Sequence, residues 1–113
     1  MSGWLRVHGT ARPTLRLFRT IVDDEGGRAY ARAHHLGDPF FDGFFDAPTG
    51  GRLPLDLAAD TICTGITIDP GAQLDDHTIP CADLLAAART VTVRVVEWRS
   101  RGRVVQASEL FRP

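Results

Sequence analysis

Two segments near the C-terminus constrain the fold of this chain more than any other feature. Residues 90–98 and 103–111 are rich in valine and other strand-forming residues, and they flank the short polar segment 99–102, which ends in Gly102. Two such segments joined by a tight glycine-containing turn predict a β-hairpin. Val96 and Trp98 fall on the otherwise polar face of the first segment, which predicts a β-bulge or burial on both faces.

More strands are predicted upstream. Residues 14–22 are rich in β-branched and apolar residues, and residues 28–34 alternate polar with apolar. The acids and glycines of residues 23–27 between them are typical of a turn, so the two segments predict a second hairpin. Shorter strands are predicted at residues 4–7 and 66–68.

Two helices complete the prediction. In residues 52–63, Pro54 is tolerated in a first turn, and Leu55, Ala58, Ala59 and Ile62 share one helical face. The threonine-rich end of this segment suits a strand equally well. Residues 80–88 contain strong helix formers after Pro80, which predicts a short helix.

These elements predict one domain over residues 1–113, a length that can bury a single core. The expected fold class is α+β and strand-rich, with an antiparallel sheet wrapped around one central helix, because a sheet and a helix must pack as layers. A small all-β barrel or sandwich is the alternative.

Residues 36–51 combine six glycines and prolines with four phenylalanines, Phe40, Phe41, Phe44 and Phe45. The glycines and prolines predict a loop rather than a long regular element. Exposed aromatic clusters are uncommon in monomers, so the loop is expected to fold over the core or to lie in an interface or pocket mouth.

The composition argues against several classes of partner and location. All 13 basic residues are arginine, and 14 acids bring the net charge to −1, which argues against a nucleic-acid partner. The apolar runs are too short to span a bilayer, and the N-terminus lacks the pattern of a signal peptide, so the expected location is the cytoplasm. We expect Cys63 and Cys81 to be buried small hydrophobes, without a disulfide, metal or cofactor.

Three strings make the chain similar to hotdog-fold acyl-CoA thioesterases and enoyl-thioester dehydratases. Residues 49–61 (TGGRLPLDLAADT) resemble a thioesterase motif of a histidine, two glycines and a leucine-rich helix with an acid, although Thr49 stands at the histidine position. Residues 34–43 (HHLGDPFFDG) resemble a dehydratase motif, but further loop separates them from the predicted helix. The C-terminal hairpin resembles the last strands of the same fold.

The resemblance implies a homodimer that hydrolyses or dehydrates an acyl thioester carried by coenzyme A or an acyl carrier protein. Backbone N–H groups after Gly50 and Gly51 would bind the substrate oxyanion, and an acid or histidine would transfer protons. The implied catalytic residues are Asp60, Asp56, His34 and His35, with an acyl pocket lined by Phe40, Phe41, Phe44 and Phe45.

Two other functions stay open. The chain could be a non-catalytic β-rich subunit of a larger assembly, such as a phage or accessory particle, with the phenylalanine segment as its interface. Residues 70–83 also resemble the first metal motif of cupins, which would imply a small-molecule-binding barrel; His77 and Asp83 fit that motif, but Ile79 replaces its second histidine. An enzyme should bring Asp56 or Asp60 to His34 or His35, whereas a structural subunit should hold them apart.

Overall fold

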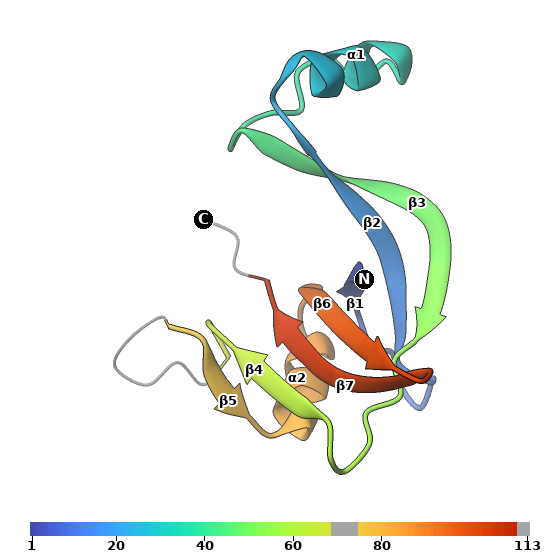
Figure 1. Ribbon diagram of the computed structural model, residues 1–113, viewed down its shortest axis with the longest axis vertical. Helices are drawn as coiled ribbons and strands as arrows, with labels where there is room; N and C mark the ends of the chain where they lie inside the picture. The colour runs from blue at the N-terminus through green and yellow to red at the C-terminus, as the bar shows by residue number, and fades with distance from the viewer. Residues whose placement is uncertain (69–74, 111–113) are drawn as a thin grey trace.

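A computed structural model describes residues 1–68 and 75–110. Its seven strands form one sheet in the order β3-β2-β1-β6-β7-β4-β5, antiparallel except where β4 pairs with β7 (Figure 1). The strands are β1 Ser2–Leu5, β2 Thr14–Val22, β3 Phe44–Pro54, β4 Ile62–Gly65, β5 His77–Ile79, β6 Val93–Ser100 and β7 Arg103–Glu109, and the helices are α1 Glu25–Ala33 and α2 Cys81–Ala88.

The core lies on one face of this sheet, under α2. Leu84 and Ala88 of the helix are fully buried with strand residues such as Leu5, Leu15 and Val95. The strand-rich α+β class is thus confirmed. The sheet is not wrapped around a helix at residues 52–63 in the described chain, so the finer hotdog arrangement is not confirmed.

The opposite face of the sheet, which we call the open face, carries no helix among the described residues. Its rungs follow from the strand register: Ile62, Gln106 and Trp98 are direct neighbours across β4, β7 and β6. Ile62 and Trp98 remain about half exposed, at 54% and 47%. Large apolar side chains are therefore accessible on this second face.

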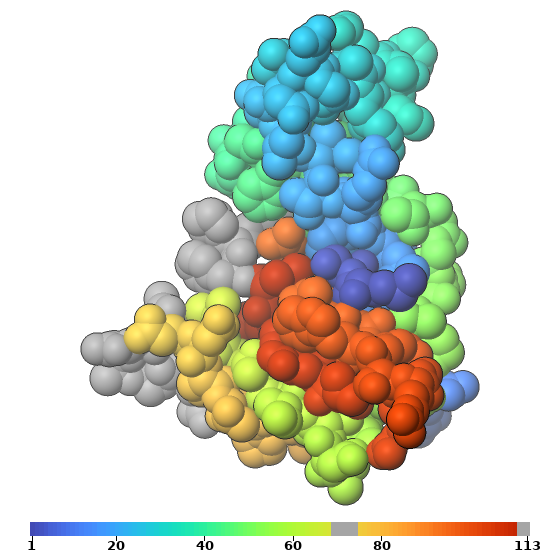
Figure 2. All heavy atoms as spheres, in the orientation of Figure 1, coloured from blue at the N-terminus to red at the C-terminus, as the bar shows by residue number. Residues whose placement is uncertain are grey.

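The β2–β3 ribbon extends beyond the rest of the sheet and carries α1 at its far end; we call residues 18–48 the arm (Figures 1 and 2). The radius of gyration is 15.2 Å, whereas a compact domain of this length would have about 13 Å. The arm accounts for this extended shape.

A bulge bends the arm where it leaves the sheet. The register shifts between Arg16 and Phe18, so that residues 49–51 lie opposite Leu17 alone. Gly50 adopts φ +84°, and Thr49 Oγ1 donates to the Leu17 carbonyl while accepting from the Gly51 N–H. Extra residues on one strand increase its local twist and bend, as the curve of β3 in Figure 1 shows.

Several sequence predictions are confirmed. The C-terminal hairpin forms around Arg101 and Gly102, both with positive φ, and a bulge follows Trp98 in the register. The helix predicted at residues 80–88 is α2, and residues 14–22 are β2.

The predicted strand at residues 28–34 and its hairpin with residues 14–22 are wrong. Residues 25–33 form α1, and β2 pairs with β3. Asp24, expected in a turn, is the helix N-cap and accepts a 2.7 Å hydrogen bond from the Gly27 N–H. A carboxylate there satisfies an otherwise unpaired backbone donor and starts a helix, which the alternation of the next residues concealed.

The helix predicted at residues 52–63 is also wrong. β3 ends at Pro54, an extended segment follows, and β4 begins at Ile62. Leu53, Leu55 and Leu57 pack on the core at the alternating spacing of extended chain, while Ile62 of the expected helical face is exposed. The loop predicted over residues 36–51 likewise becomes strand from Phe44 onward, because an edge strand tolerates Pro48 and Pro54.

Cys63 and Cys81 form a disulfide, which corrects the prediction of two free thiols. The pairing follows from local structure: Cys63 lies opposite Ile79 in the β4–β5 ladder, and α2 begins two residues after Ile79. Disulfides persist mainly in oxidising compartments, so this pair does not support the predicted cytoplasmic location. None of the described helices is long and apolar enough to cross a membrane.

Glu109 connects the end of β7 to the segment after β4. Its carboxylate accepts from the backbone N–H groups of Ile66 and Thr67 and from the Thr67 hydroxyl. Burial alone would raise the pKa of Glu109, but these hydrogen bonds outweigh burial and hold the pKa below its usual value. The carboxylate is therefore ionised at neutral pH and fixes this part of the sheet.

Candidate functional site

The tip of the arm consists of α1 and the segment that leads from it into β3. The helix is seated against the end of β2 because Gly27 has no side chain. A Cβ at Gly27 would lie 1.8 Å from the Val22 carbonyl oxygen, whereas one at the neighbouring Gly26 would meet nothing closer than 3.6 Å. Only one of these two glycines is required for the position of the helix.

We expect Gly27→Ala to lower the free energy of unfolding by at least about 1–3 kcal/mol, because the clash forces α1 off β2. Gly26→Ala is the matched control and should be neutral or stabilising by up to about 1 kcal/mol, since alanine favours helix. Urea denaturation of both variants measures the difference. Equal effects would show that α1 is not held against β2 in this way.

Aromatic rings gather at this tip. The Tyr30 ring stacks on His34 with centroids 4.1 Å apart and lies 6.1 Å from Phe45, and Phe40 meets Phe45 edge-on at 5.2 Å. Arg19 lies over the Tyr30 ring at 5.5 Å. Phe40 and Phe45 thus belong to a small local cluster that stiffens the tip.

Phe41 does not join that cluster. Its side chain is 93% exposed, and it lies between Asp38 and Asp42, which are exposed as well. Phe44, by contrast, packs under the guanidinium of Arg94, 5.4 Å from its ring centre. Of the four phenylalanines predicted to line an acyl pocket, three contact the protein itself and one faces solvent.

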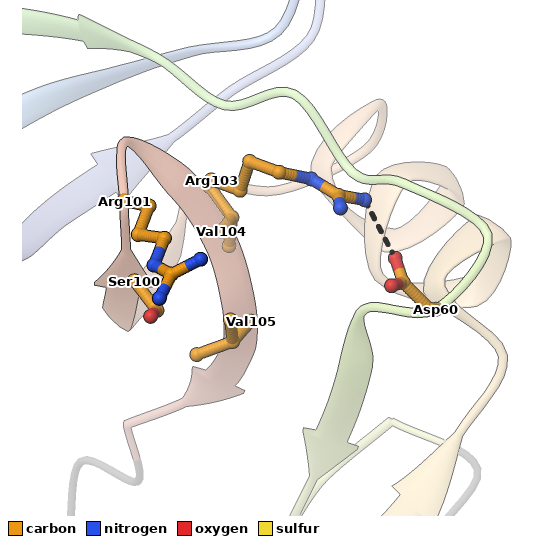
Figure 3. A pocket seen from close by; sticks show the side chains of 6 residues that line it. All are labelled: Asp60, Ser100, Arg101, Arg103, Val104 and Val105. Atoms are coloured by element: carbon orange, nitrogen blue, oxygen red, sulfur yellow. Dashed lines mark hydrogen bonds and ion pairs between the residues drawn. The ribbon is translucent and has the colours of Figure 1, made fainter.

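The two predicted catalytic acids lie in the segment between β3 and β4, at the opposite end of the molecule from the arm tip (Figure 1). Asp56 forms an exposed ion pair with Arg12, whose hydrogen bond holds the Asp56 pKa below its usual value and weakens it as a base. Asp60 pairs with Arg103 at 3.1 Å. Figure 3 shows this pair at the edge of an open hollow of about 350 Å³, beside Ser100, Arg101, Val104 and Val105.

The two predicted catalytic histidines are on the arm tip. His34 is the C-cap residue of α1 with its ring on Tyr30, and His35 is exposed with φ 55°. The structure therefore does not bring Asp56 or Asp60 to His34 or His35. A nucleophile or water would have no acid and histidine converging on it.

Gly50 and Gly51 do not precede a helix, as the thioesterase motif requires. They lie within β3, where they form the bulge that bends the arm. No helix N-terminus is present there to supply an oxyanion site. The glycines are explained by backbone geometry alone.

The described residues contain no group of three metal-ligand side chains that could hold an ion. Part of the cupin-like string, residues 70–74, lies outside the described residues. Both ring nitrogens of His77 are within 2.9 Å of backbone carbonyls, those of Asp75 and Ile68. Both ring nitrogens of this histidine are thereby engaged with the backbone.

The sequence did not reveal a row of side chains across the open face of the sheet. Arg52, Arg16, Trp4 and Arg94 are direct neighbours across β3, β2, β1 and β6. Arg94 also donates two hydrogen bonds to Asp46 of the arm, at 2.6 and 3.0 Å. Only the strand register brings these residues together, so spacing along the chain gave no signal.

No protein-family model, no curated protein and no solved structure matches this chain. The resemblance to hotdog enzymes thus has no support besides the quoted motifs.

Proposed function

We propose that this chain is a non-catalytic structural subunit that associates with further copies of itself through its arm. The observation that carries the proposal is the arm tip. It extends from the body of the domain, is stiffened by its own aromatic cluster and presents Phe41 at 93% exposure. A rigid, exposed aromatic side chain is typical of an interface anchor, because it buries a large area on contact at little entropic cost.

The separation of the predicted catalytic groups supports this proposal. Asp56 and Asp60 are in exposed ion pairs in the segment between β3 and β4. His34 and His35 are on the arm tip. Catalysis by proton transfer needs such groups within hydrogen-bond reach of one substrate. A structural subunit has no such requirement.

The open face of the sheet also supports the proposal of a structural subunit. Ile62 and Trp98 are both about half exposed on the same cross-strand row, on either side of Gln106. Exposed apolar patches on small proteins commonly mark contacts with other proteins. The molecule therefore offers apolar surface at two separate places, as a subunit with several neighbours would.

The test is the concentration dependence of the sedimentation coefficient for wild-type protein and for Phe41→Ser. We expect the wild type to associate and the variant to dissociate about 30-fold more readily, the effect of losing an interface anchor. Val105→Ser is the matched control, because Val105 is 43% exposed and lies on β7, outside the arm. It should change association by no more than about twofold.

Two outcomes would contradict the proposal. One is a wild-type protein that stays monomeric up to its solubility limit. The other is equal loss of association in Phe41→Ser and Val105→Ser, which would mean that the arm plays no special part.

The acyl-thioester function, with coenzyme A or acyl carrier protein thioesters as substrates, stays a prediction from the motifs. The cytoplasmic location likewise stays a prediction, made from the short apolar runs and the N-terminus. No contact described above favours either of them over the assembly function.

A further inference from the structure

We infer that the arm tip of one copy docks in an arginine-lined pocket on the sheet of a second copy. This inference rests on the proposed function and names the surface that receives the arm. The pocket has a volume of about 510 Å³ and is lined by Trp4, Arg6, His8, Thr14, Arg16, Arg52 and Thr92. It lies on the open face of the sheet, where the arm begins.

The pocket concentrates positive charge. Arg16 and Arg52 are direct cross-strand neighbours, and the Arg16 guanidinium lies 5.0 Å from the centre of the Trp4 ring. Arg6 lines the same pocket, and none of the described residues that line it is an acid. Like charges directly opposite one another destabilise a sheet, so the row is unfavourable until an anion neutralises it.

The arginines of this pocket have no internal counter-ion in the described part of the chain. Arg6, Arg16 and Arg52 take part in none of the ion pairs there, whereas Arg12, Arg28, Arg94, Arg99 and Arg103 each bind a carboxylate. Guanidinium groups recognise carboxylates through paired hydrogen bonds. The pocket is therefore complementary to an acidic partner.

The arm tip is such a partner. Residues 23–43 carry five acids and two arginines, a net charge of −3, and the other residues carry nine acids and eleven arginines, a net charge of +2. Asp38 and Asp42 form no ion pair among the described residues, and they flank the exposed Phe41. Their carboxylates match the arginines, and the Phe41 ring matches Trp4.

The pocket cannot be filled by the tip of its own chain. Arg16 and the end of β2 at Val22 are six residues apart in one strand, about 20 Å at the usual rise. Over that length β2 runs from the rest of the sheet toward α1 at the far end of the arm (Figure 1). A tip that fills the pocket must then come from a second copy, and each such contact leaves one tip and one pocket free for further copies, which gives a ring or an open chain.

Charge exchange tests this contact in the full-length protein. The pocket variant carries Arg16→Glu and Arg52→Glu, and the tip variant carries Asp38→Arg and Asp42→Arg. We expect each alone to dissociate about 100-fold more readily than wild type, because like charges then meet across the contact. An equimolar mixture of the two, and a chain carrying all four changes, should recover association, since every contact again pairs acid with base.

Arg101→Glu with Arg103→Glu is the control of equal charge change at the β6–β7 turn, and it should associate as wild type does. If the wild type and the pocket variant associate equally well, the docking site is overturned and the proposed function stands. A wild type that does not associate overturns both. Binding of a single-stranded oligonucleotide that the pocket variant loses and the tip variant keeps would overturn the second copy as occupant in favour of a phosphate ligand.

Discussion

Asp46→Ala is expected to lower the free energy of unfolding by about 3–5 kcal/mol, among the largest effects of any single substitution in this chain. Asp46 and Arg94 form a two-point ion pair whose side chains are only 1% and 12% exposed. Thr20 donates a further hydrogen bond to the same carboxylate. Removing the carboxylate leaves a buried guanidinium charge without this compensation, which water cannot readily supply.

The pair also joins the arm to the body, because Asp46 is on β3 and Arg94 is on β6. The Arg94 guanidinium also contacts the rings of Phe18 and Phe44, 5.3 and 5.4 Å from their centres. Amide hydrogen exchange in residues 18–22 and 44–48 of Asp46→Ala should therefore accelerate more than exchange around α2.

Asp60→Ala is the control for this prediction. Asp60 forms an ion pair of similar length with Arg103, but both side chains are about two-thirds exposed or more. Exposed pairs contribute about 0–1 kcal/mol, so this variant should unfold almost as the wild type does. Similar losses in the two variants, measured by urea denaturation, would contradict the anchoring role of Asp46.

Loss of the disulfide is the second large effect that we expect. Cys63 and Cys81 are 18 residues apart in sequence, and closing a loop of that size stabilises a folded protein by about 3 kcal/mol through the unfolded chain. Denaturation with and without dithiothreitol should show that loss. Cys63→Ala with Cys81→Ala should be destabilised similarly and should no longer respond to the reductant.

Alanine is the suitable replacement because Cys63 is 1% exposed and a buried serine would add a cost of its own. Alkylation of the protein, unfolded without reductant, counts its free thiols by mass. Two modified cysteines in protein purified under air would contradict the disulfide.

The strands near the termini were predictable because each repeats a local pattern. The C-terminal hairpin combines alternating valines with a turn at Arg101 and Gly102, and those signals lie within a few residues of one another. Val96 and Trp98, which depart from the apolar and polar alternation, lie on the face of the sheet opposite α2, and the register shift comes only after Trp98. Local sequence was sufficient for this hairpin but not for β4 and β5, which also pair and are consecutive in the chain.

The middle of the chain was mispredicted because local patterns there fit two structures. The acids before Gly26 suit a turn as well as a helix N-cap, and the leucines from Leu53 to Leu57 suit a helix as well as an extended segment. Contact with β2 selected the helix in one case, and burial on the sheet selected the extended form in the other. Neither contact is encoded within the segment itself.

The candidate surfaces depend on long-range pairing in the same way. Phe41 was identified from sequence as part of an unusual aromatic segment, and its exposure was the part that required the structure. The arginine pocket was not found, because Arg6, Arg16 and Arg52 become neighbours only through the register of β1, β2 and β3. Net charge near zero concealed the separation of charge between the arm tip and the body.

Sedimentation velocity of wild-type protein over a rising concentration series, beside Phe41→Ser, tests the central claim most directly. A self-associating subunit should shift to larger sedimentation coefficients as concentration rises, and Phe41→Ser should require about 30-fold more protein for the same shift. A wild-type protein whose sedimentation coefficient stays that of a monomer at every concentration would contradict the account.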